Sequence, residues 1–462
     1  MQGFIALSPE LLFEADCPRC HQVVKAADWK MPGLWMLARF ACRTCGVDFF
    51  FDLPYSLGVT APCYLDTKAS KATPKFMGDW YATLTSNAWK NRVNSKVSVT
   101  IQRKCYGQKV CIVNCLYPWW GDAVNLLLRV NRLKNLNGLD VVVIINPALE
   151  WLVPDFVSGI WVTNQSVSNN SEWNEAVDAA VKEIIKAQNL HVFLPITFQS
   201  ARLTPAELQE ACKIQPFPRD EWALRLKEKA VITFMARADR TWSRAKQRIS
   251  IKQTLLDRFI MRLPKPFRKA LERFHLASSN SEQLQNIVYL ADKLKTSFPR
   301  IEFVVCGVGR TGSFPSWIKD LRVDEFAPDT NRIWAELAAQ SHVFIGVHGS
   351  HMSLFASMAG SCIELTPIDR LRNVLQCSPI TSSEVGESIY CYRFLPVDTS
   401  ADYLSELVGE IILNYPLVKV GQAGEFSRPL SQQELSCVRE ELAKRHSVIE
   451  TLNKDYVARL AT

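Results

Sequence analysis

The stretch Val343-Phe-Ile-Gly-Val-His-Gly-Ser-His-Met-Ser-Leu-Phe-Ala-Ser-Met-Ala-Gly360 organises the chain. It begins with a short apolar run, turns at Gly349 and continues with apolar residues at helical spacing, which predicts a strand followed by a helix. We expect Ser350 to cap the start of this helix and Gly360 to end it in a left-handed conformation. A second apolar run, Ser361–Leu365, follows at once and predicts another strand.

This turn is a candidate phosphate site. A helix that starts at the carboxyl end of a strand directs free backbone N–H groups and the positive end of its dipole beyond the sheet. The stretch and the residue before it also hold three of the chain's seven histidines, His342, His348 and His351. The alternative is a tight buried turn with incidental histidines, and the stretch alone favours neither.

Length and composition describe a globular protein of more than one domain. A chain of 462 residues is too long for one ordinary domain, so two or three are expected. An apolar content of 48% with 22% charged residues is typical of proteins with real cores. No apolar run is long enough to span a membrane, and the first ten residues do not resemble a secretory signal. Fourteen cysteines in such a chain favour free thiols, a metal site and a cytoplasmic location.

The net charge of +8 is concentrated in one segment. Residues 237–273 contain twelve Lys or Arg and three Asp or Glu, a local charge of +9, so the rest of the chain sums to 8 − 9 = −1. Within this segment, apolar residues at helical spacing alternate with basic ones, which suggests contact with an anionic membrane surface or a nucleic acid. The charged face of an ordinary surface helix is the commoner explanation.

Two paired cysteine motifs near the N-terminus predict a metal site. Cys17-Pro-Arg-Cys20 and Cys42-Arg-Thr-Cys45 are separated by 21 residues, a spacing that brings four thiolates to one tetrahedral zinc ion. We therefore expect a zinc ribbon over residues 1–56, with the zinc in a structural role. The alternative, four unrelated cysteines, is disfavoured by the paired spacing.

The remainder of the chain alternates between apolar runs and helical patterns. Runs such as Val110–Leu116 and Leu139–Ile145 predict buried parallel strands covered by helices on both faces. We predict an α/β fold with two Rossmann-like parallel-sheet lobes, at residues 57–226 and 227–425. A C-terminal helix within residues 426–462 is expected to pack back on the body.

Ligands of parallel sheets bind beyond the carboxyl ends of the strands, and two segments fall there. The turn Trp119–Asp122 follows the first predicted strand, and the run from Val231 delivers Arg237 and Arg240 to a loop. Arginine forks match phosphate oxygens in pairs, as a nucleoside diphosphate requires. A surface salt-bridge cluster with Asp239 is an equally weighted alternative.

The loop Gly307-Val-Gly-Arg-Thr-Gly312 matches a dinucleotide-binding pattern, but its position argues against that function. The dinucleotide motif belongs on the first strand of its unit and must open a helix. Here the loop follows a later strand and runs into Ser313-Phe-Pro315. Its glycines are expected to permit a close backbone approach or a sharp turn.

Two facing α/β units with anion-binding groups in the second resemble the GT-B glycosyltransferase architecture. The loop with Arg237 and Arg240 and the unit around His348-Gly-Ser350 are similar to family 61-like sugar transferases with an H-G-[AS] turn. The resemblance implies a nucleotide sugar bound by the second lobe and an acceptor by the first. It would place His348, Gly349, Ser350 and both arginines at the diphosphate, and Glu364 near a ribose or base. The zinc ribbon and the basic segment depart from that family.

Sugar transfer without a catalytic metal is chemically consistent with these residues. The departing diphosphate gains negative charge, and metal-dependent transferases commonly neutralise this charge with a cation held by an Asp-x-Asp pair. This sequence has no Asp-x-Asp pair, and arginines are an alternative source of positive charge. A base near the acceptor hydroxyl is also needed. Asp122 is our first candidate, with Asp79 and Glu150 behind it and His348 as a substitute. A simple helix cap is the alternative role for Asp122.

Two other classes of function remain open. One is a zinc-ribbon protein that binds or modifies nucleic acid through the basic 237–273 segment, although that segment holds few aromatic residues for stacking. The other is a metallohydrolase using His348 and His351, whose spacing differs from that of a zinc-binding helix. We expect a cytoplasmic or membrane-peripheral transferase whose acceptor is a saccharide, a lipid-linked group or a protein.

Overall fold

The computed structural model describes residues 3–76, 79–134, 136, 138–196, 203–243, 265–325, 327, 329–371 and 391–426. The chain divides into two compact units, Met1–Gly409 and Glu410–Thr462. The described part of the second unit is the end of helix α12 (Ala401–Phe426), which begins in the first unit. Among the described residues, no helix has both the length and the apolar character needed to cross a membrane.

The second lobe of the first unit is built on a parallel sheet of six strands. The strands run in the order β16-β15-β14-β17-β18-β19, and every neighbouring pair is parallel. Their bounds are β14 (Ala230–Arg237), β15 (Ile301–Val308), β16 (Lys319–Val323), β17 (Val343–Val347), β18 (Ser361–Thr366) and β19 (Tyr392–Pro396). The chain adds strands on one side of β14 and then returns to its other side at β17, so the order reverses between these two strands.

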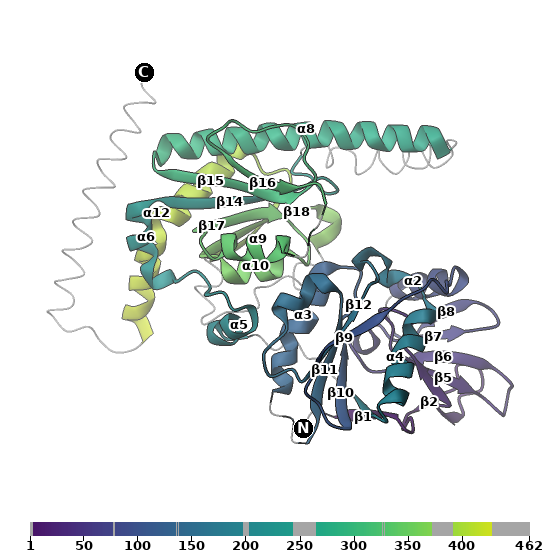
Figure 1. The fold of residues 1–462 in the computed structure, drawn as a ribbon. Helices are drawn as coiled ribbons and strands as arrows, with labels where there is room; N and C mark the ends of the chain where they lie inside the picture. Colours follow the sequence, from purple (N-terminus) through teal and green to yellow (C-terminus); the bar gives the residue numbers. More distant parts are fainter. Residues whose placement is uncertain are drawn as a thin grey trace. The chain divides into compact units, whose positions relative to one another are not determined.

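Helices cover both faces of this sheet. Helix α8 (Lys265–Ser297) lies over one face, and α9 (Thr330–Ala338) and α10 (Met352–Met358) lie over the other (Figure 1). Strands β17 and β18 are buried along their whole length, because neighbouring strands and helices enclose them on every side. The predicted parallel-sheet character of this lobe is confirmed.

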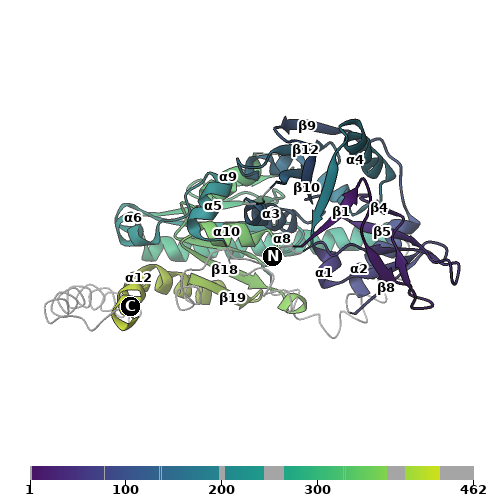
Figure 2. The same ribbon diagram turned by 90° about the horizontal axis from the view of Figure 1, so that it is seen from below.

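The first lobe is a mostly parallel sheet in the order β1-β13-β10-β11-β12-β9. The inner strands β10, β11, β12 and β13 are parallel, whereas β1 and β9 pair antiparallel at the edges. Helices α3 (Trp120–Arg129) and α4 (Glu175–Ala187) lie on opposite sides of the sheet (Figure 2). Strand bounds are β1 (Phe4–Ser8), β9 (Val99–Lys104), β10 (Lys109–Asn114), β11 (Asp140–Ile145), β12 (Gly159–Thr163) and β13 (His191–Pro195).

The cysteine-rich segment forms two small antiparallel sheets. A two-stranded sheet joins β2 (Glu14–Asp16) to β3 (Val23–Lys25), and a five-stranded sheet runs in order from β4 to β8. The predicted boundary at residue 56 falls between β6 and β7 of that second sheet. Its strands are β4 (Asp28–Lys30), β5 (Leu37–Ala41), β6 (Asp48–Asp52), β7 (Cys63–Asp66) and β8 (Lys71–Pro74), and helix α2 (Asp79–Lys90) follows.

Short helices connect these elements. Helix α1 (Leu57–Thr60) lies between β6 and β7, and α5 (Pro205–Cys212) and α6 (Trp222–Glu228) lead from the first lobe to β14. Four 3-10 helices are also present among the described residues, η1 (Val130–Leu133), η2 (Pro147–Leu152), η3 (Val167–Ser171) and η4 (Arg219–Glu221).

Both predicted caps of the 343–360 helix are wrong. The residue that precedes α10 as its N-cap is His351, and Ser350 lies one position earlier in the turn. The C-cap is Ala359 in an extended conformation, so Gly360 does not end the helix in a left-handed one. The Ser350 hydroxyl instead forms a hydrogen bond with Asp122 of the other lobe, which partly offsets the rise that burial causes in the pKa of that carboxyl.

The interpretation of the Gly307–Gly312 loop agrees with the structure. The loop follows β15, the second strand of its sheet, and leads to β16, without a helix at the loop's end. Gly307 has a φ of 124°, and a Cβ placed there would lie 1.8 Å from the Ala236 carbonyl oxygen. Glycine is therefore required for close pairing with β14. Most of the basic 237–273 segment (residues 244–264) and the predicted helix at Gln432–Leu460 lie outside the described residues.

Candidate functional site

The candidate residues of the second lobe lie where its strand order reverses. Arg237 is the last residue of β14, and His348 directly follows β17, which pairs with β14. Open parallel sheets bind their ligands in the crevice beyond the carboxyl ends of two such strands, because the connections diverge there to opposite faces. The two segments selected from the sequence therefore meet at the expected place.

Direct contacts join the two segments. A guanidinium N–H of Arg240 donates to the carbonyl oxygen of His348. Arg237 Nη1 lies 2.9 Å from His351 Nδ1, and a Cβ placed at Gly349 would lie 2.8 Å from the same guanidinium nitrogen. The structure thus brings Arg237, Arg240 and Gly349 into one cluster and adds His351, one of the three histidines noted at this turn in the sequence.

The cluster carries more positive than negative charge. Arg237 donates to both carboxylate oxygens of Asp239, at 2.8 and 2.6 Å, so the alternative of a salt bridge with Asp239 holds for this arginine. Arg370 is paired with Asp369 at 3.4 Å. No described carboxylate lies within ion-pair distance of Arg240, whose pKa is lowered by burial and by the charges of Arg237 and Arg370. An anion beside Arg240 would relieve this repulsion.

His351 offers the cluster a second hydrogen-bond donor. Arginine can only donate, so His351 Nδ1 accepts from Arg237 and the proton of the neutral ring is on Nε2. Burial, followed by the charges of Arg237 and Arg240, holds the pKa of His351 well below its usual value. Its Nε2 is buried and has no hydrogen-bond partner among the described residues. A buried donor without an acceptor is costly unless a ligand or water satisfies it.

His348 and Glu364 form a buried pair beneath the turn. Their side chains are 2% and 0% exposed, and His348 Nδ1 lies 2.5 Å from one Glu364 oxygen. Tyr392 donates its hydroxyl to the other oxygen. Burial raises the pKa of Glu364, and its hydrogen bond with His348 partly offsets this rise. The two Glu364 carboxylate oxygens contact His348 and Tyr392, so this residue holds the imidazole in place.

Asp122 reaches the same turn from the first lobe. It lies in the first turn of α3, and the N-cap of that helix is Trp119, so the alternative role of Asp122 as the cap is wrong. The Ser350 hydroxyl donates to its carboxylate. Burial raises the pKa of Asp122 to about 6, against the opposing effects of Ser350 and Arg129. A carboxylate with that pKa is ionised at neutral pH and suited to accept a proton. The other candidates, Asp79 and Glu150, are exposed.

A close backbone approach positions Asp122. A Cβ placed at Gly121 would lie 2.1 Å from the Ser350 carbonyl carbon and 2.3 Å from the His351 nitrogen. The rings of Trp120 and Phe355 stack next to this contact, with centroids 6.1 Å apart. Only glycine permits the first turn of α3 to touch the turn after β17, and this contact brings Asp122 to Ser350.

Gly121→Ala is therefore expected to lower the free energy of unfolding by about 1–3 kcal/mol, as added atoms do in a tightly packed site. Urea denaturation measures the change. Gly107→Ala is the matched control, since the nearest atom to its added Cβ, Asp140 Oδ2, is 3.6 Å away. Equal urea midpoints for both variants would contradict the close approach.

The four paired cysteines form a cluster that could hold a metal ion. The sulfur atoms of Cys17, Cys20, Cys42 and Cys45 all lie within 4.8 Å of one another, and two of the pairs are 3.5 Å apart. A tetrahedral zinc ion with Zn–S bonds of about 2.3 Å requires sulfur separations of roughly 3.8 Å, so the cluster fits such an ion. Among the described residues, this is the one group of three or more side chains that could bind a metal ion together. The described cysteines are all free thiols.

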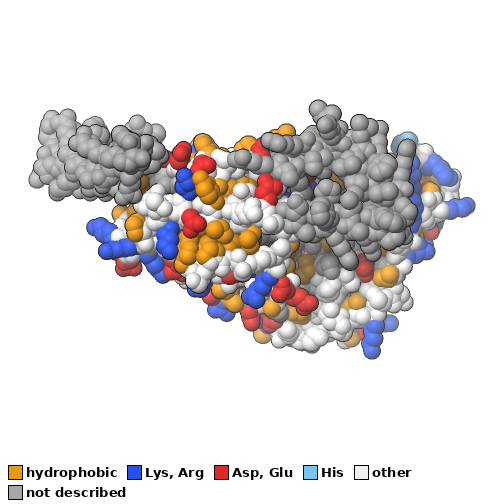
Figure 3. Space-filling model, turned by 90° about the horizontal axis from the view of Figure 1, so that it is seen from above, with side chains coloured by type: hydrophobic (Ala, Val, Ile, Leu, Met, Phe, Trp, Pro, Cys, Tyr) orange, Lys and Arg blue, Asp and Glu red, His pale blue; other side chains and the backbone are white. Residues whose placement is uncertain are grey.

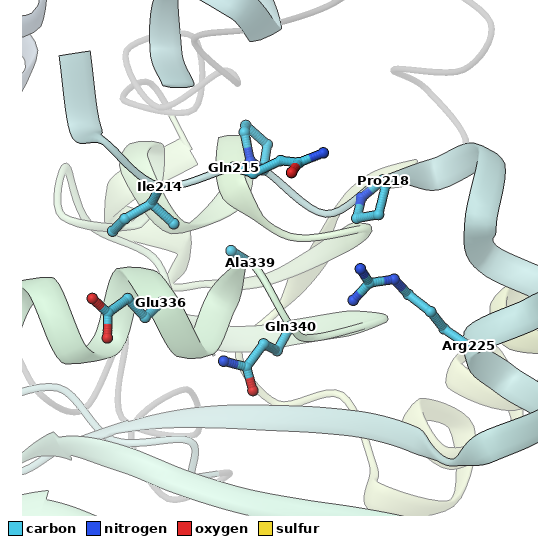
Figure 4. A pocket seen from close by; sticks show the side chains of 8 residues that line it. Ile214, Gln215, Pro218, Arg225, Glu336, Ala339 and Gln340 are labelled. Carbon is cyan, nitrogen blue, oxygen red and sulfur yellow. The ribbon is translucent and has the colours of Figure 1, made fainter. Parts of the chain in front are cut away.

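The pocket shown in Figure 4 lies away from this site. It is formed by the segment Ile214–Pro218 together with Arg225 of α6, Glu336 of α9, Ala339 and Gln340. Gln340 precedes the amino end of β17, whereas the candidate site is at the carboxyl end of the same strand. The charged groups of this pocket are already paired, Arg225 with Glu221, the residue before α6, and Glu336 with Arg332 within α9. We therefore assign the pocket no role in the candidate site.

Comparison with known proteins gives no assignment. No protein-family model matches the chain. No curated protein matches it either. A solved structure described as "OtsA apo structure" is 8% identical, with a TM-score of 0.21, and the similarity covers 71% of this chain and 74% of that one. A likeness at that TM-score establishes neither the fold nor the activity of this chain, so the function rests on the geometry of the site.

Proposed function

We propose that the chain is a glycosyltransferase of GT-B-like architecture that moves a sugar from a nucleotide sugar to an acceptor hydroxyl. The observation that carries this proposal is the group at the carboxyl ends of β14 and β17. There, within the part of the chain that the structure describes, Arg240 has no carboxylate partner and the His351 Nε2–H has no acceptor. Both groups suit the oxygens of a diphosphate at the point where parallel sheets bind ligands.

The chain's own residues divide the work of a direct displacement. Asp122 accepts the proton of the acceptor hydroxyl while that oxygen forms a bond to the anomeric carbon. The bond from this carbon to the diphosphate breaks, and the nucleoside diphosphate leaves with the electron pair. Arg240 and the His351 Nε2–H stabilise the charge that develops on the diphosphate, without a catalytic metal. Gly349 and Ser350 provide the turn that contacts it.

We assign His348 and Glu364 a positioning role. Both side chains are buried, so they act through the turn that they support and not by touching a ligand. The His348 carbonyl oxygen accepts a hydrogen bond from Arg240, which ties the buried pair to the proposed phosphate ligand. In this assignment Glu364 fixes His348, and His348 fixes Arg240.

The domain roles follow from this arrangement. The lobe at residues 227–425 would hold the nucleotide sugar, and the lobe at 57–226 would bind the acceptor beside Asp122. Zinc at Cys17, Cys20, Cys42 and Cys45 would be structural, because a site closed by four protein ligands leaves no position for a substrate. Free thiols and such a site are typical of the cytoplasm, where we place the protein.

A thermal-shift panel of UDP, GDP, ADP and CMP sugars tests the proposal. At least one sugar nucleotide is expected to raise the melting temperature, by the same amount with and without added Mg²⁺ or Mn²⁺. Absence of stabilisation by every member of the panel would contradict the function. Stabilisation that requires the added cation would contradict metal independence alone.

A nucleic-acid-binding protein remains the second candidate because of the basic 237–273 segment. Residues 244–264 of this segment lie outside the described part of the chain. The face drawn in Figure 3 carries basic and acidic side chains interspersed. Binding to random DNA that weakens steeply with salt would favour this candidate over sugar transfer.

A further inference from the structure

Two exposed tryptophans touch each other beside the proposed catalytic base. Of the chain's thirteen tryptophans, Trp80 and Trp119 are the exposed ones, at 52% and 37% exposure. Their ring centroids are 5.9 Å apart and their planes meet at 69°, although 38 residues separate them in the sequence. Buried tryptophan is usual in this chain, so the meeting of its two exposed tryptophans at one point requires an explanation.

The fold fixes the backbone that carries both rings. Trp119 is the N-cap of α3, and its carbonyl oxygen accepts a hydrogen bond of 3.0 Å from the Asp122 N–H. Trp80 precedes Tyr81, which is fully buried and donates its hydroxyl to Asp52 at 2.9 Å. The backbone that carries each indole is therefore fixed, and Trp119 lies within one helical turn of Asp122.

We infer that Trp80 and Trp119 form the acceptor subsite and that the acceptor is a saccharide whose pyranose ring stacks on an indole face. This inference rests on the proposed function and names its acceptor class. The axial C–H groups of a pyranose pack against the electron-rich face of an indole, while its hydroxyl groups need polar partners at the rim. Carboxylates lie close to both rings in the chain, since exposed Asp79 adjoins Trp80 and half-buried Asp122 follows Trp119 by three residues in the first turn of α3.

A membrane surface is a poorer partner for the same pair of rings. Exposed tryptophans do anchor proteins at bilayers, but an anionic bilayer repels acidic neighbours. Asp79 adjoins Trp80 in the sequence and Asp122 lies three residues after Trp119, so the acidic charge near the two tryptophans favours a hydroxyl-rich ligand.

Binding of the full-length protein to a printed array of pyranose-containing oligosaccharides tests the inference without requiring turnover. The wild type is expected to bind a subset of these glycans, and Trp119→Ala and Trp80→Ala are each expected to weaken that binding about tenfold or more, as loss of a central aromatic contact does. Trp119→Phe retains an aromatic face and should restore most of the affinity. Tyr403→Ala, at a 54% exposed aromatic residue on α12, is the matched control.

A second measurement separates this inference from the proposed function. The thermal shift with nucleotide sugars should be the same in Trp119→Ala as in the wild type, because the donor groups are in the other lobe. Glycan binding that depends on tryptophan, without any nucleotide binding, would support the subsite and overturn the transferase. Three results would overturn the subsite. The first is the absence of glycan binding by the wild type, and the second is a variant carrying both Trp80→Ala and Trp119→Ala that binds glycans as well as the wild type does. The third result is tryptophan-dependent binding to phosphatidylglycerol vesicles and to no glycan.

Discussion

Asp122→Asn is expected to lower kcat by about 10²- to 10⁴-fold, the range over which a positioned base contributes to catalysis. The asparagine keeps the size of the side chain and can still accept the Ser350 hydrogen bond, but it cannot take a proton. Initial rates of nucleoside diphosphate release from the sugar nucleotide that binds measure the change. Glu150→Gln is the control, since this exposed acid belongs to another element of the same lobe. An unchanged kcat would remove Asp122 from the chemistry.

The pH dependence follows from the same group. Burial raises the pKa of Asp122 to about 6, so the ionised base accumulates as the pH rises through about 6 and activity should increase over that interval. A raised pKa in the folded state also means that ionised Asp122 destabilises the fold above pH 6. The asparagine variant should therefore be at least as stable as the wild type at neutral pH, and loss of activity will not reflect unfolding.

Removal of the metal from the cysteine cluster is expected to have the largest effect on stability. Structural zinc sites contribute about 10 kcal/mol or more of binding free energy, which unfolds small domains when it is lost. Elemental analysis should find one zinc ion per chain in the wild type and almost none in Cys42→Ser. The variant should also lose the cooperative melting of its N-terminal segment.

Cys105→Ser is the matched control, because this exposed thiol lies outside the cluster. Purified protein without zinc would contradict the metal assignment. Full retention of zinc by Cys42→Ser would show that this cysteine is not a ligand.

The sequence predicts the buried strands of both lobes because their central strands are continuous apolar runs. Strands β10, β11, β14, β15 and β17 largely follow this pattern. Edge strands do not. Strand β9 alternates half-buried and exposed residues over Val99–Lys104, and β19 is only partly buried, so neither is a continuous apolar run. Their pairing depends on neighbours that are distant in the chain.

The candidate site was predictable where it depends on topology and not where it depends on tertiary contact. The carboxyl-edge rule placed Arg240 and Gly349 together, and the structure brings them to the same turn. No local pattern indicates that Ser350 bonds Asp122, because these residues belong to different lobes. One signal was available for Glu364. A carboxylate within an inner parallel strand is enclosed on both faces and must be paired, as it is by His348.

Isothermal titration calorimetry with UDP, GDP and ADP tests the central claim most directly. The wild type should bind at least one of them, and Arg240→Ala should weaken that binding about 10- to 100-fold, the loss expected for a charge-assisted hydrogen bond to phosphate. Arg332→Ala, which removes an exposed and paired arginine from the same lobe, should leave the affinity unchanged. No binding of any diphosphate, or equal binding by Arg240→Ala, would contradict a diphosphate site at the carboxyl ends of β14 and β17.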